Sequence, residues 1–511
     1  ASADGDTVLV GAGTFTETLV LDRAVRLRGV DSESTVIDGG RAGAVIWVTA
    51  GTVATVSDLA ITGGMRDAGA GILNQGALSL RDVVIRGNAA PADIESFGGA
   101  VYNYGGSLSV RGATISDNEA AYGGAILNAG TLVISRSTLR DNRARKGGGA
   151  IFNYDGTVIV NNSIVMGNST AARGGGAFFN ASAMAIANST IADNRSAEFG
   201  GAVFGDTGGV YITNTTFSGN EGVYGGGAVY LLQGESAITS STLTGNKGSV
   251  GGALNVQGDA PPSLLNPIAA LKGADWFGEL RSEGANIDSG VTCAFVAPGD
   301  QSSTDVRLRP LASNGGFTLT HALPADSPAV DMGDLVGCID YVGYYLATDQ
   351  RGYVRDIDGN KDGDIRCDVG AFEYDPADPG VGGATPTAGP ITGADVTACP
   401  TGGTHTTIGA AIAAVPSGGT VGVCAATFAE RLTIDKPVTL KGAGSAVSLI
   451  EGSAGGPVLT IVGDVAVTVT DVGFVRGQGI LNRQGRLTLR RSTIIHQNSA
   501  ERGAIQSSAG T

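Results

Sequence analysis

The sequence is poor in the residues from which membrane spans and many active sites are built. Charged residues make up 16% of the 511 residues and aromatic residues 5%, and the chain holds only 3 histidines. Scarce aromatic residues leave few platforms on which a sugar ring can stack. No apolar run reaches the roughly 18 residues of a membrane-spanning helix, so no such span is expected in this chain.

Basic charge is lacking as well. Lys and Arg number 33 against 48 Asp and Glu, which gives a formal net charge of -15. A nucleic acid is bound through a basic field that displaces counterions, so no nucleic-acid partner is expected. No signal peptide is visible, but residue 1 falls within a domain, and a targeting segment can lie upstream of it.

Cysteine is rare, and all five cysteines lie outside the repeats described below. They have no CxxC spacing, which disfavours zinc and favours disulfides formed in an oxidising compartment. The sequence does not fix their connectivity, although Cys399 and Cys424 flank a short helical pattern, and Cys338 and Cys367 bracket an acidic segment. The disulfide candidates are Cys338, Cys367, Cys399 and Cys424.

Glycine, by contrast, is abundant with 83 residues, and it belongs to an internal repeat. A phrase of Gly-Gly-Ala and further apolar residues, often closed by Asn, begins at Gly123, Gly148, Gly175, Gly200, Gly226 and Gly251. The glycine pairs are expected to supply positive φ angles at a corner of each repeat.

A row of asparagines interleaves with this phrase. From Asn142 to Asn246 its members are 26 residues apart, and Asn88 and Asn118 extend it with looser spacing. Asn tolerates left-handed backbone angles and can bond the turn of the next repeat, so we expect a stacked structural row. Its predicted members are Asn118, Asn142, Asn168, Asn194, Asn220 and Asn246.

The segments between the corners are short and β-branched, as in Thr131–Ser135 and Thr157–Val160. Such 4–6-residue alternating runs are strands, and a fixed period of about 26 residues is typical of a β-solenoid. The sequence therefore predicts an all-β fold, a right-handed parallel β-helix with about 26 residues per coil. Like residues of successive coils are expected to stack about 4.8 Å apart.

The chain also repeats at a longer distance. Thr420–Gly442 matches Thr7–Gly29 at an offset of 413, which indicates tandem units. We expect β-helix coils over 1–260, a closing segment over 261–374, a Pro/Gly/Thr-rich linker over 375–397, and a second unit over 398–511.

The second unit carries a feature that the first does not show. Ile408, Ala411, Ile412 and Val415 have helical spacing, which predicts a short amphipathic helix capping the core. An uncapped end exposes apolar side chains and unpaired strand edges. Either the sequence is a window on a longer tandem protein, or chains associate end to end as a fibre or sheath.

The closing segment carries an ordered string of motifs, at Pro310–Gly316, Thr318–Leu323, Ser327–Asp331, Asp349–Gly352 and Cys367–Glu373. This succession resembles the "choice-of-anchor Q" family of bacterial surface proteins, and the upstream coils resemble polymorphic outer-membrane, adhesin-like repeats. The resemblance implies export, a parallel β-helix and display at the cell surface, with no established chemistry.

One acidic segment resembles an extracellular calcium loop. Asp358, Asn360 and Asp362 fit loop positions 1, 3 and 5, and Gly363 fits the sharp turn, but position 12 is Val369 in place of the usual Glu. A solvated acidic turn is the alternative. The candidate ligands are Asp356, Asp358, Asn360, Asp362, Asp364 and Asp368.

Catalytic residues are not expected. Asp117 and Asp141 occupy the same position in adjacent coils, at a separation that suits a retaining glycosidase, but each directly precedes a row asparagine at a turn. His321 is expected to be a packing or hydrogen-bonding residue. Aromatic residues recur near the glycine phrase, at Tyr102, Tyr104, Phe152, Tyr154, Phe178 and Phe179, and core stacking is favoured over a ligand stripe.

These observations predict a non-enzymatic structural or adhesive protein, extracellular or at the cell surface. An end-to-end fibre subunit is the first alternative, and a polysaccharide lyase or glycosidase the second. Expected partners are further copies of the chain, other surface molecules or polysaccharide, and no cofactor besides possible calcium is expected.

Overall fold

The computed structural model describes residues 4–91, 95–270, 276–290, 295–334, 337–355, 357–377, 394–399, 403–424, 426–442, 448–452, 456–470, 472–475, 480–490, 493–495 and 505–508. The chain forms two compact units. The first comprises Ala1–Asn314 and Thr318–Gly382, and the second takes in Gly383–Thr511.

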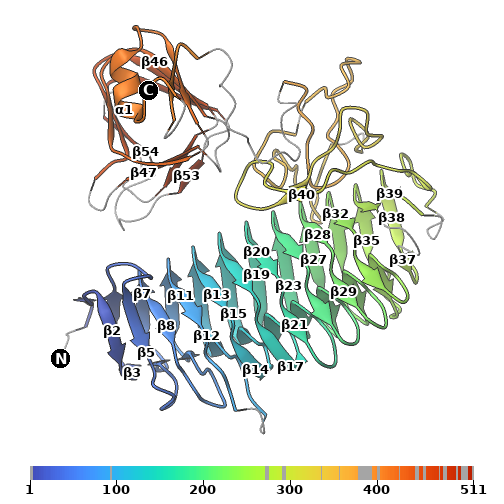
Figure 1. Ribbon diagram of the computed structural model, residues 1–511. Helices are drawn as coiled ribbons and strands as arrows, with labels where there is room; N and C mark the ends of the chain where they lie inside the picture. Colours follow the sequence, from blue (N-terminus) through green and yellow to red (C-terminus); the bar gives the residue numbers. More distant parts are fainter. Residues whose placement is uncertain are drawn as a thin grey trace. The chain divides into compact units, whose positions relative to one another are not determined.

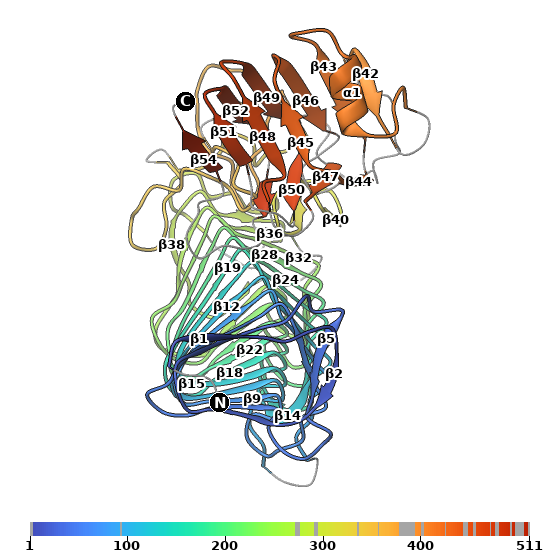
Figure 2. The same ribbon diagram turned by 90° about the vertical axis from the view of Figure 1, so that its left-hand side faces the viewer.

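The first unit is a parallel β-helix whose turns contribute short strands to a 21-stranded and a 12-stranded sheet, and its middle turns contribute to a six-stranded sheet as well (Figures 1 and 2). The sheet with 12 strands shows the rungs most plainly, because each rung adds one strand. Its strands are β2 Gly13–Thr16, β5 Thr35–Asp38, β8 Ala60–Thr62, β11 Val84–Arg86, β13 Thr114–Ser116, β16 Thr138–Arg140, β20 Ile164–Met166, β24 Thr190–Ala192, β28 Thr216–Ser218, β32 Thr242–Thr244, β36 Ile268–Ala270 and β39 Ile287–Asp288.

The other two sheets differ in extent, since the six-stranded sheet runs only over the rungs between Glu119 and Gly248. The six-stranded sheet holds β14 Glu119–Tyr122, β17 Arg143–Gly147, β21 Ser169–Thr170, β25 Arg195–Ser196, β29 Glu221–Gly222 and β33 Lys247–Gly248. The 21-stranded sheet holds β1 Asp6–Leu9, β3 Leu19–Leu21, β4 Val25–Arg28, β6 Ile46–Val48, β7 Val53–Ser57, β9 Ile72–Asn74, β10 Ala77–Arg81, β12 Val101–Arg111, β15 Ile126–Ser135, β18 Ile151–Asn153, β19 Thr157–Asn161, β22 Phe178–Asn180, β23 Ala183–Ala187, β26 Val203–Gly205, β27 Val210–Thr213, β30 Val229–Leu231, β31 Ala237–Thr239, β34 Leu254–Val256, β35 Ser263–Leu265, β37 Trp276–Phe277 and β38 Arg281–Gly284.

The core consists of apolar columns that run along the helix axis. In the 12-stranded sheet, Ile85, Ile115, Leu139, Val165 and Ile191 occupy one register position in successive rungs, and all are buried. Burying a side chain of this size stabilises the fold by roughly 1.5–3 kcal/mol. The repeat of apolar residues in the sequence therefore becomes a continuous core, and the predicted parallel β-helix is confirmed.

The asparagine row lies inside the turn that follows the 12-stranded sheet. From Asn88 to Asn246 each side-chain Nδ2 donates to Oδ1 of the next asparagine, at 2.9–3.1 Å. From Asn88 to Asn220, the backbone N–H of each also donates to that oxygen. These buried amides satisfy one another along the axis, as a stacked row requires.

A second asparagine row, not singled out from the sequence, lines the corner inside the 21-stranded sheet. Asn74, Asn103, Asn128 and Asn153 each donate to the Oδ1 of the next member, at 2.7–2.9 Å, and the row ends at Asn180. From Asn103 on, these asparagines close the Gly-Gly-Ala phrase, so the phrase itself carries the signal for this row.

The two glycines of each pair serve different purposes. The first, such as Gly148, has a positive φ of 64°. The second, such as Gly149, faces the backbone of the next rung, and an added Cβ would lie 2.0 Å from the carbonyl oxygen of Gly176. Only glycine fits the second position, because successive rungs approach too closely for a side chain.

The second unit repeats the architecture with sheets of five, four and four parallel strands. They are β42 Val396–Ala398, β43 Thr420–Val423, β44 Ala426–Ala429, β45 Leu432–Ile434, β46 Val438–Gly442, β47 Ser448–Glu451, β48 Leu459–Val462, β49 Ala466–Thr470, β50 Gly473–Val475, β51 Ile480–Arg483, β52 Arg486–Arg490, β53 Thr493–Ile495 and β54 Ile505–Ser508.

The short helix expected in this unit is present as α1 (Ile408–Ala414). Its residues Ile408, Ala411 and Ile412 are buried in the core of the unit. The Glu430 carboxylate accepts the free N–H groups of Ile408 and Gly409, and Lys436 donates to carbonyls at the other end, so both charges complement the helix dipole. A disulfide joins Cys399 to Cys424 on either side of α1.

Among the helical residues that the structure describes, no helix has the length and apolar character to cross a membrane.

Candidate functional site

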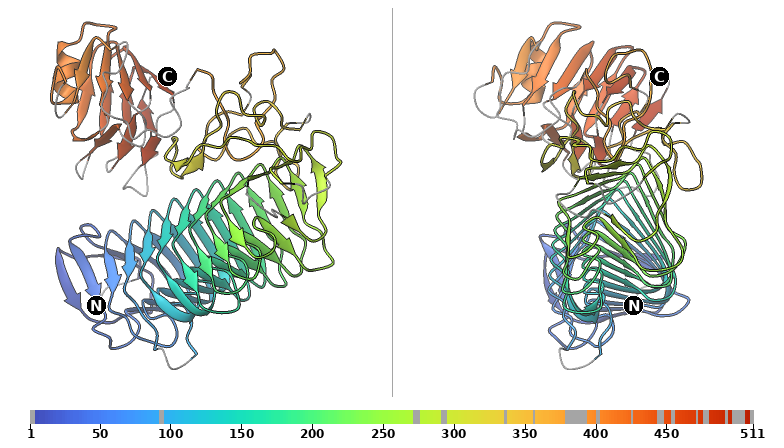
Figure 3. Two further views of the ribbon diagram at one scale, coloured as in Figure 1. Left: turned by 45° about the vertical axis from the view of Figure 1, so that its right-hand side comes forward. Right: turned by 90° about the vertical axis from the view of Figure 1, so that its right-hand side faces the viewer.

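The coils extend past residue 260 to β39. From residue 295 onward the closing segment has little regular structure and lies along the outer face of the 12-stranded sheet, beside the later rungs (Figure 3). A column of outward-facing threonines receives it. Thr190 donates to the Leu319 carbonyl at 2.6 Å, Thr216 donates to Oε1 of Gln350 at 2.6 Å, and the Ala371 N–H donates to Thr242 at 3.0 Å. The threonines repeat every 26 residues, so the coils carry a preformed surface for this segment.

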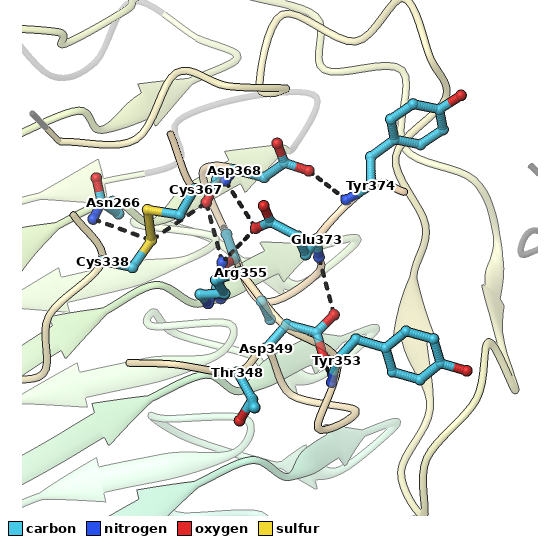
Figure 4. A network of polar contacts seen from close by, with 12 residues as sticks. Asn266, Cys338, Thr348, Asp349, Tyr353, Arg355, Cys367, Asp368, Glu373 and Tyr374 are labelled. Carbon is cyan, nitrogen blue, oxygen red and sulfur yellow. Dashed lines mark hydrogen bonds and ion pairs between the residues drawn. A yellow bond between two sulfur atoms is a disulfide. The ribbon is translucent and has the colours of Figure 1, made fainter. Parts of the chain in front are cut away.

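Two buried arginines, Arg351 and Arg355, organise the segment from within, and Figure 4 shows the network around Arg355. Arg355 donates to the Asn214 side chain of the coils at 2.7 Å and to Glu373 at 3.3 Å. Arg351 is held by Asp349 at 2.7 Å and lies over the ring of Phe372, with 3.6 Å between the guanidinium carbon and the ring centroid. The ordered string of motifs noted in the sequence thus supplies one polar network.

Two carboxyl groups share this network with Arg355. Burial raises the pKa of Asp368 to about 7, although Asp368 accepts hydrogen bonds from the backbone of Tyr374 and Asp331. Burial also raises the pKa of Glu373, and the nearby Asp368 raises it further. One guanidinium between two buried carboxyl groups favours a protonated acid within the network at mildly acidic pH.

The network is tied to the coils by polar bonds and cross-linked internally by a disulfide. Cys338 and Cys367 form a disulfide with their Cα atoms 6.0 Å apart. Asn266, at a turn of the coils, donates through its side chain to the Cys338 sulfur and accepts from the Asp334 backbone at 2.9 Å. The closing segment is therefore clamped to the flank of the β-helix.

A groove of about 620 Å³ lies between the last rungs and the closing segment. Tyr211 of the coils stacks on Tyr341 of the segment, with ring centroids 4.4 Å apart. The lining carries three carboxylates and one arginine, so it disfavours an anionic ligand. These charged residues are Glu235, Glu283, Asp340 and Arg281. The sequence did not single out this groove, because its two walls, 211–283 and 339–343, are more than 50 residues apart in the chain.

The acidic segment predicted to bind calcium forms a tight loop whose side chains accept its own backbone N–H groups. Asp358 accepts from Asp362 at 3.1 Å and from Gly363 at 3.0 Å, and Asn360 accepts from Asp362 at 2.8 Å. Asp331 holds the loop by accepting from Gly359 and Asn360.

The remaining candidate ligands are dispersed. Asp364 pairs with Arg366, Asp368 belongs to the buried network, and Asp356 lies outside the described residues. Within the described part of the chain, no three carboxylate, imidazole or thiolate side chains converge to hold a metal ion. The calcium assignment stays a prediction.

The aspartates weighed as a catalytic pair are turn residues. Asp117 and Asp141 have φ angles of 57°, and Gly167 takes the same turn position one rung later with a φ of 65°. Asp141 is paired with Arg140 at 2.7 Å. Asp117 nevertheless lines an open groove of about 370 Å³ on the outer face of the 12-stranded sheet, together with Arg86 and Arg140.

A second carboxylate pair was missed in the sequence. Asp58 and Asp82 occupy successive rungs at the turn before the 12-stranded sheet, about 4.8 Å apart along the axis. Arg28 donates to Asp58 at 3.2 Å. Burial raises the pKa of Asp82 to about 6, and the Asp58 charge contributes. Asn162 and Asn188 take the same turn position, so left-handed geometry selects these residue types.

His321 is a structural residue. Its ring lies between the Arg309 carbonyl oxygen at 2.7 Å and the Ser218 hydroxyl at 3.0 Å, and burial lowers its pKa. His405 contacts the neighbouring Thr404 hydroxyl, and His496 lies outside the described residues.

Comparison with known proteins supports the fold. The family model for the right-handed β-helix region matches residues 31–176. No curated protein matches the chain.

Solved structures give distant likenesses. The PL6 family alginate lyase AlyGC is 15% identical, with a TM-score of 0.37, over 100% of this chain and 76% of that one. XylC in complex with xylose is 11% identical, with a TM-score of 0.33, over 65% of this chain and 67% of that one. At these scores neither likeness supports an assignment of function or substrate.

Proposed function

We propose that the protein is an extracellular or cell-surface β-helix rod with a structural or adhesive role and without catalytic activity. The observation that carries this proposal is the uniformity of the coils. Position by position, successive rungs repeat the same apolar, asparagine and glycine residues, which suits a rigid rod of set length. The resemblance of the closing segment to bacterial surface proteins points the same way.

The disulfides support a location outside the cytosol. Cys338–Cys367 and Cys399–Cys424 are both closed, and such bonds persist in oxidising compartments. Alkylation of the protein as it leaves its producing cell, followed by mass mapping, should leave these four cysteines unmodified until a reductant is added. Free thiols at all four positions would contradict the proposed location.

A polysaccharide-cleaving enzyme is the second candidate, and the groove beside Asp117 is the observation that favours it. Arginine and carboxylate side chains meet there on an open surface. Two further carboxyl groups with unlike surroundings, Asp58 and Asp82, lie at a turn of the same face.

A polysaccharide screen separates the two candidates. The intact chain is incubated with neutral and acidic polysaccharides, and new reducing ends and unsaturated products are measured. We expect neither above the level of a heat-denatured control. Cleavage that is lost in Asp117→Asn, Asp141→Asn or Asp82→Asn, while binding is retained, would replace the structural proposal with the enzymatic one.

A further inference from the structure

A column of large side chains runs along the outside of the 21-stranded sheet, at the position just before the second asparagine row. Strand register places Trp47, Leu73, Tyr102, Leu127 and Phe152 in successive rungs. The column continues through Phe179, Phe204 and Tyr230.

The later part of this column is covered. Phe152, Phe179, Phe204 and Tyr230 stack with ring centroids 4.4–5.3 Å apart, and all four are buried. Residues of the loops that precede the glycine pairs pack over them, among them Phe199. This part is a satellite core, as favoured from the sequence.

In the earlier part of the column Leu73 and Leu127 are buried, but aromatic side chains in and beside the column are exposed. Trp47 is 37% exposed, and two tyrosines that follow row asparagines, Tyr104 and Tyr154, are 55% and 65% exposed. Gln75 and Tyr104 occupy the same register position in successive rungs, one residue after the second asparagine row. The Trp47 Nε1 donates to Gln75 at 2.9 Å, so the indole contacts the position that Tyr104 occupies one rung later. Aromatic surface is thus presented along one line of the rod.

The spacing of these rings is regular. Tyr104 pairs with Ala129 one rung later, and Tyr154 donates its backbone N–H to Asn128, which places it one rung beyond Ala129. The two tyrosines are therefore two rungs, or about 10 Å, apart along the axis. Trp47 lies two rungs before Tyr102, whose ring is 5.4 Å from that of Tyr104.

The platform is firmly held and uncharged. Ala129 packs against the buried aromatic stack, and Tyr102 contacts Phe97 with ring centroids 5.9 Å apart. Trp47, Gln75, Tyr102, Tyr104 and Tyr154 carry no formal charge but offer an amide and phenol hydroxyls as hydrogen-bonding groups. Aromatic faces with a polar rim suit a ligand that is apolar on one face and hydroxylated at its edges.

We propose that Trp47, Tyr104 and Tyr154 form a binding surface for an uncharged, extended β-1,4-linked polysaccharide. In such a chain alternate sugar rings present the same face, so platforms two rungs apart meet equivalent rings of successive disaccharide units. Ala129 leaves a gap between the tyrosines for the intervening ring. This inference deepens the proposed adhesive role, and rests on it for the placement of the protein outside the cell.

Binding to insoluble glycans tests the proposal. The intact chain is incubated with microcrystalline cellulose, chitin and, as an acidic comparison, calcium alginate beads, and the bound fraction is measured across protein concentrations. We expect binding to at least one of the two neutral glycans. Tyr104→Ala with Tyr154→Ala should weaken it by about tenfold or more, because two stacking contacts are lost.

Tyr344→Ala is the matched control, since Tyr344 is 74% exposed but lies in the closing segment. It should leave binding unchanged. Near-native circular dichroism of the double variant shows that a loss of binding is not a loss of fold, and both tyrosines are exposed enough for the fold to tolerate their removal.

The spacing can be tested by moving aromatic rings along the column. Ala181 and Asp206 occupy the same register position as Tyr154 in later rungs. Ala181 lies one rung beyond Tyr154, and Asp206 lies two rungs beyond Tyr154. Asp206→Tyr should strengthen binding several-fold, and Ala181→Tyr should not. Equal gains from both variants would contradict the two-rung match.

Three outcomes overturn the proposal: no binding to either neutral glycan, binding to alginate alone, or full binding by the double variant. Release of soluble sugars during these incubations would instead contradict the non-enzymatic function and leave the binding surface in place. The two failures are therefore distinguishable.

Discussion

At the scale of the residue, the fold depends on buried amides that satisfy one another. Asn168 accepts from the backbone and side chain of Asn142, and donates to the carbonyl oxygens of Leu139 and Met166 and to Oδ1 of Asn194. Each bond contributes about 1 kcal/mol when made, but an unsatisfied buried partner costs more. A single row member therefore supports the rungs on both sides of it.

We expect Asn168→Ala to lower the free energy of unfolding by about 3 kcal/mol, because it leaves buried donors and acceptors of both neighbouring rungs without partners. Urea unfolding of the purified chain measures this. Thr157→Ala, at an exposed position of the same rung, is the control and should change the stability little. A loss below about 1 kcal/mol for Asn168→Ala would mean that the row is not structural.

The buried carboxyl groups predict a pH dependence. The pKa of Asp368 rises from an ordinary 3.8 to about 7 in the folded chain, and the pKa of Glu373 rises too. Between pH 3.8 and about pH 7 the folded state holds more protons than the unfolded state. The stability of the closing segment should therefore fall as the pH rises through this range.

Glu373→Gln tests this prediction, because it removes one titrating group and keeps an oxygen to accept from Asp368 and Arg355. The fall of the melting temperature between about pH 4 and pH 7 should become shallower. Asp141→Asn removes an exposed carboxylate and should keep the parent slope. An unchanged slope in Glu373→Gln would refute the assignment of the pH dependence to this pair.

At the scale of the element, the rungs were predictable and the docking of the closing segment was not. Rungs repeat, so the 26-residue spacing from Asn142 to Asn246 is enough to predict how successive rungs pair. The closing segment makes single, long-range contacts, such as Thr190 to Leu319 and Asn214 to Arg355, which lie 129 and 141 residues apart in sequence. Such contacts do not repeat along the chain, so no periodicity in the sequence predicts them. The motifs of the closing segment could therefore be recognised in the sequence, but the surface of the coils that they bind could not.

The Cys338–Cys367 disulfide should hold the closing segment in place. Closing a loop of this size removes entropy from the unfolded chain worth about 3 kcal/mol. In Cys338→Ala with Cys367→Ala, we expect faster hydrogen exchange at the N–H groups of Gly370 and Ala371, which bond to the coils. Exchange in the coils around Ile115 and Leu139 should not change. Unaltered exchange at Gly370 and Ala371 would show that the polar network holds the closing segment in place without the disulfide.

The acidic loop gives a separate prediction. If Asp358, Asn360 and Asp362 bind calcium, millimolar calcium should raise the melting temperature of the first unit, by the linkage between binding and folding. Asp358→Asn with Asp362→Asn should abolish this shift, whereas Asp326→Asn, at another exposed carboxylate of the closing segment, should retain it. An equal shift in all three proteins would point to nonspecific charge screening.

At the scale of the whole molecule, one design accounts for both units. Short apolar strands cannot bury themselves alone, so each rung is stabilised by the rungs on either side, and length is gained without a larger core. In the second unit a helix covers the core beside β42 and β43, and in the first unit the closing segment covers an outer face. What the rod presents to a partner is then set by a few side chains that depart from the repeat, such as Tyr104 and Tyr154.

The most direct test of the account is an experimental density map of the coils, obtained by crystallography or electron microscopy. It should show parallel strands from residue 101 to residue 256, with the side chains of Asn118 to Asn246 directly above one another along the axis. Antiparallel hairpins in this region, or asparagine side chains directed to solvent, would contradict it.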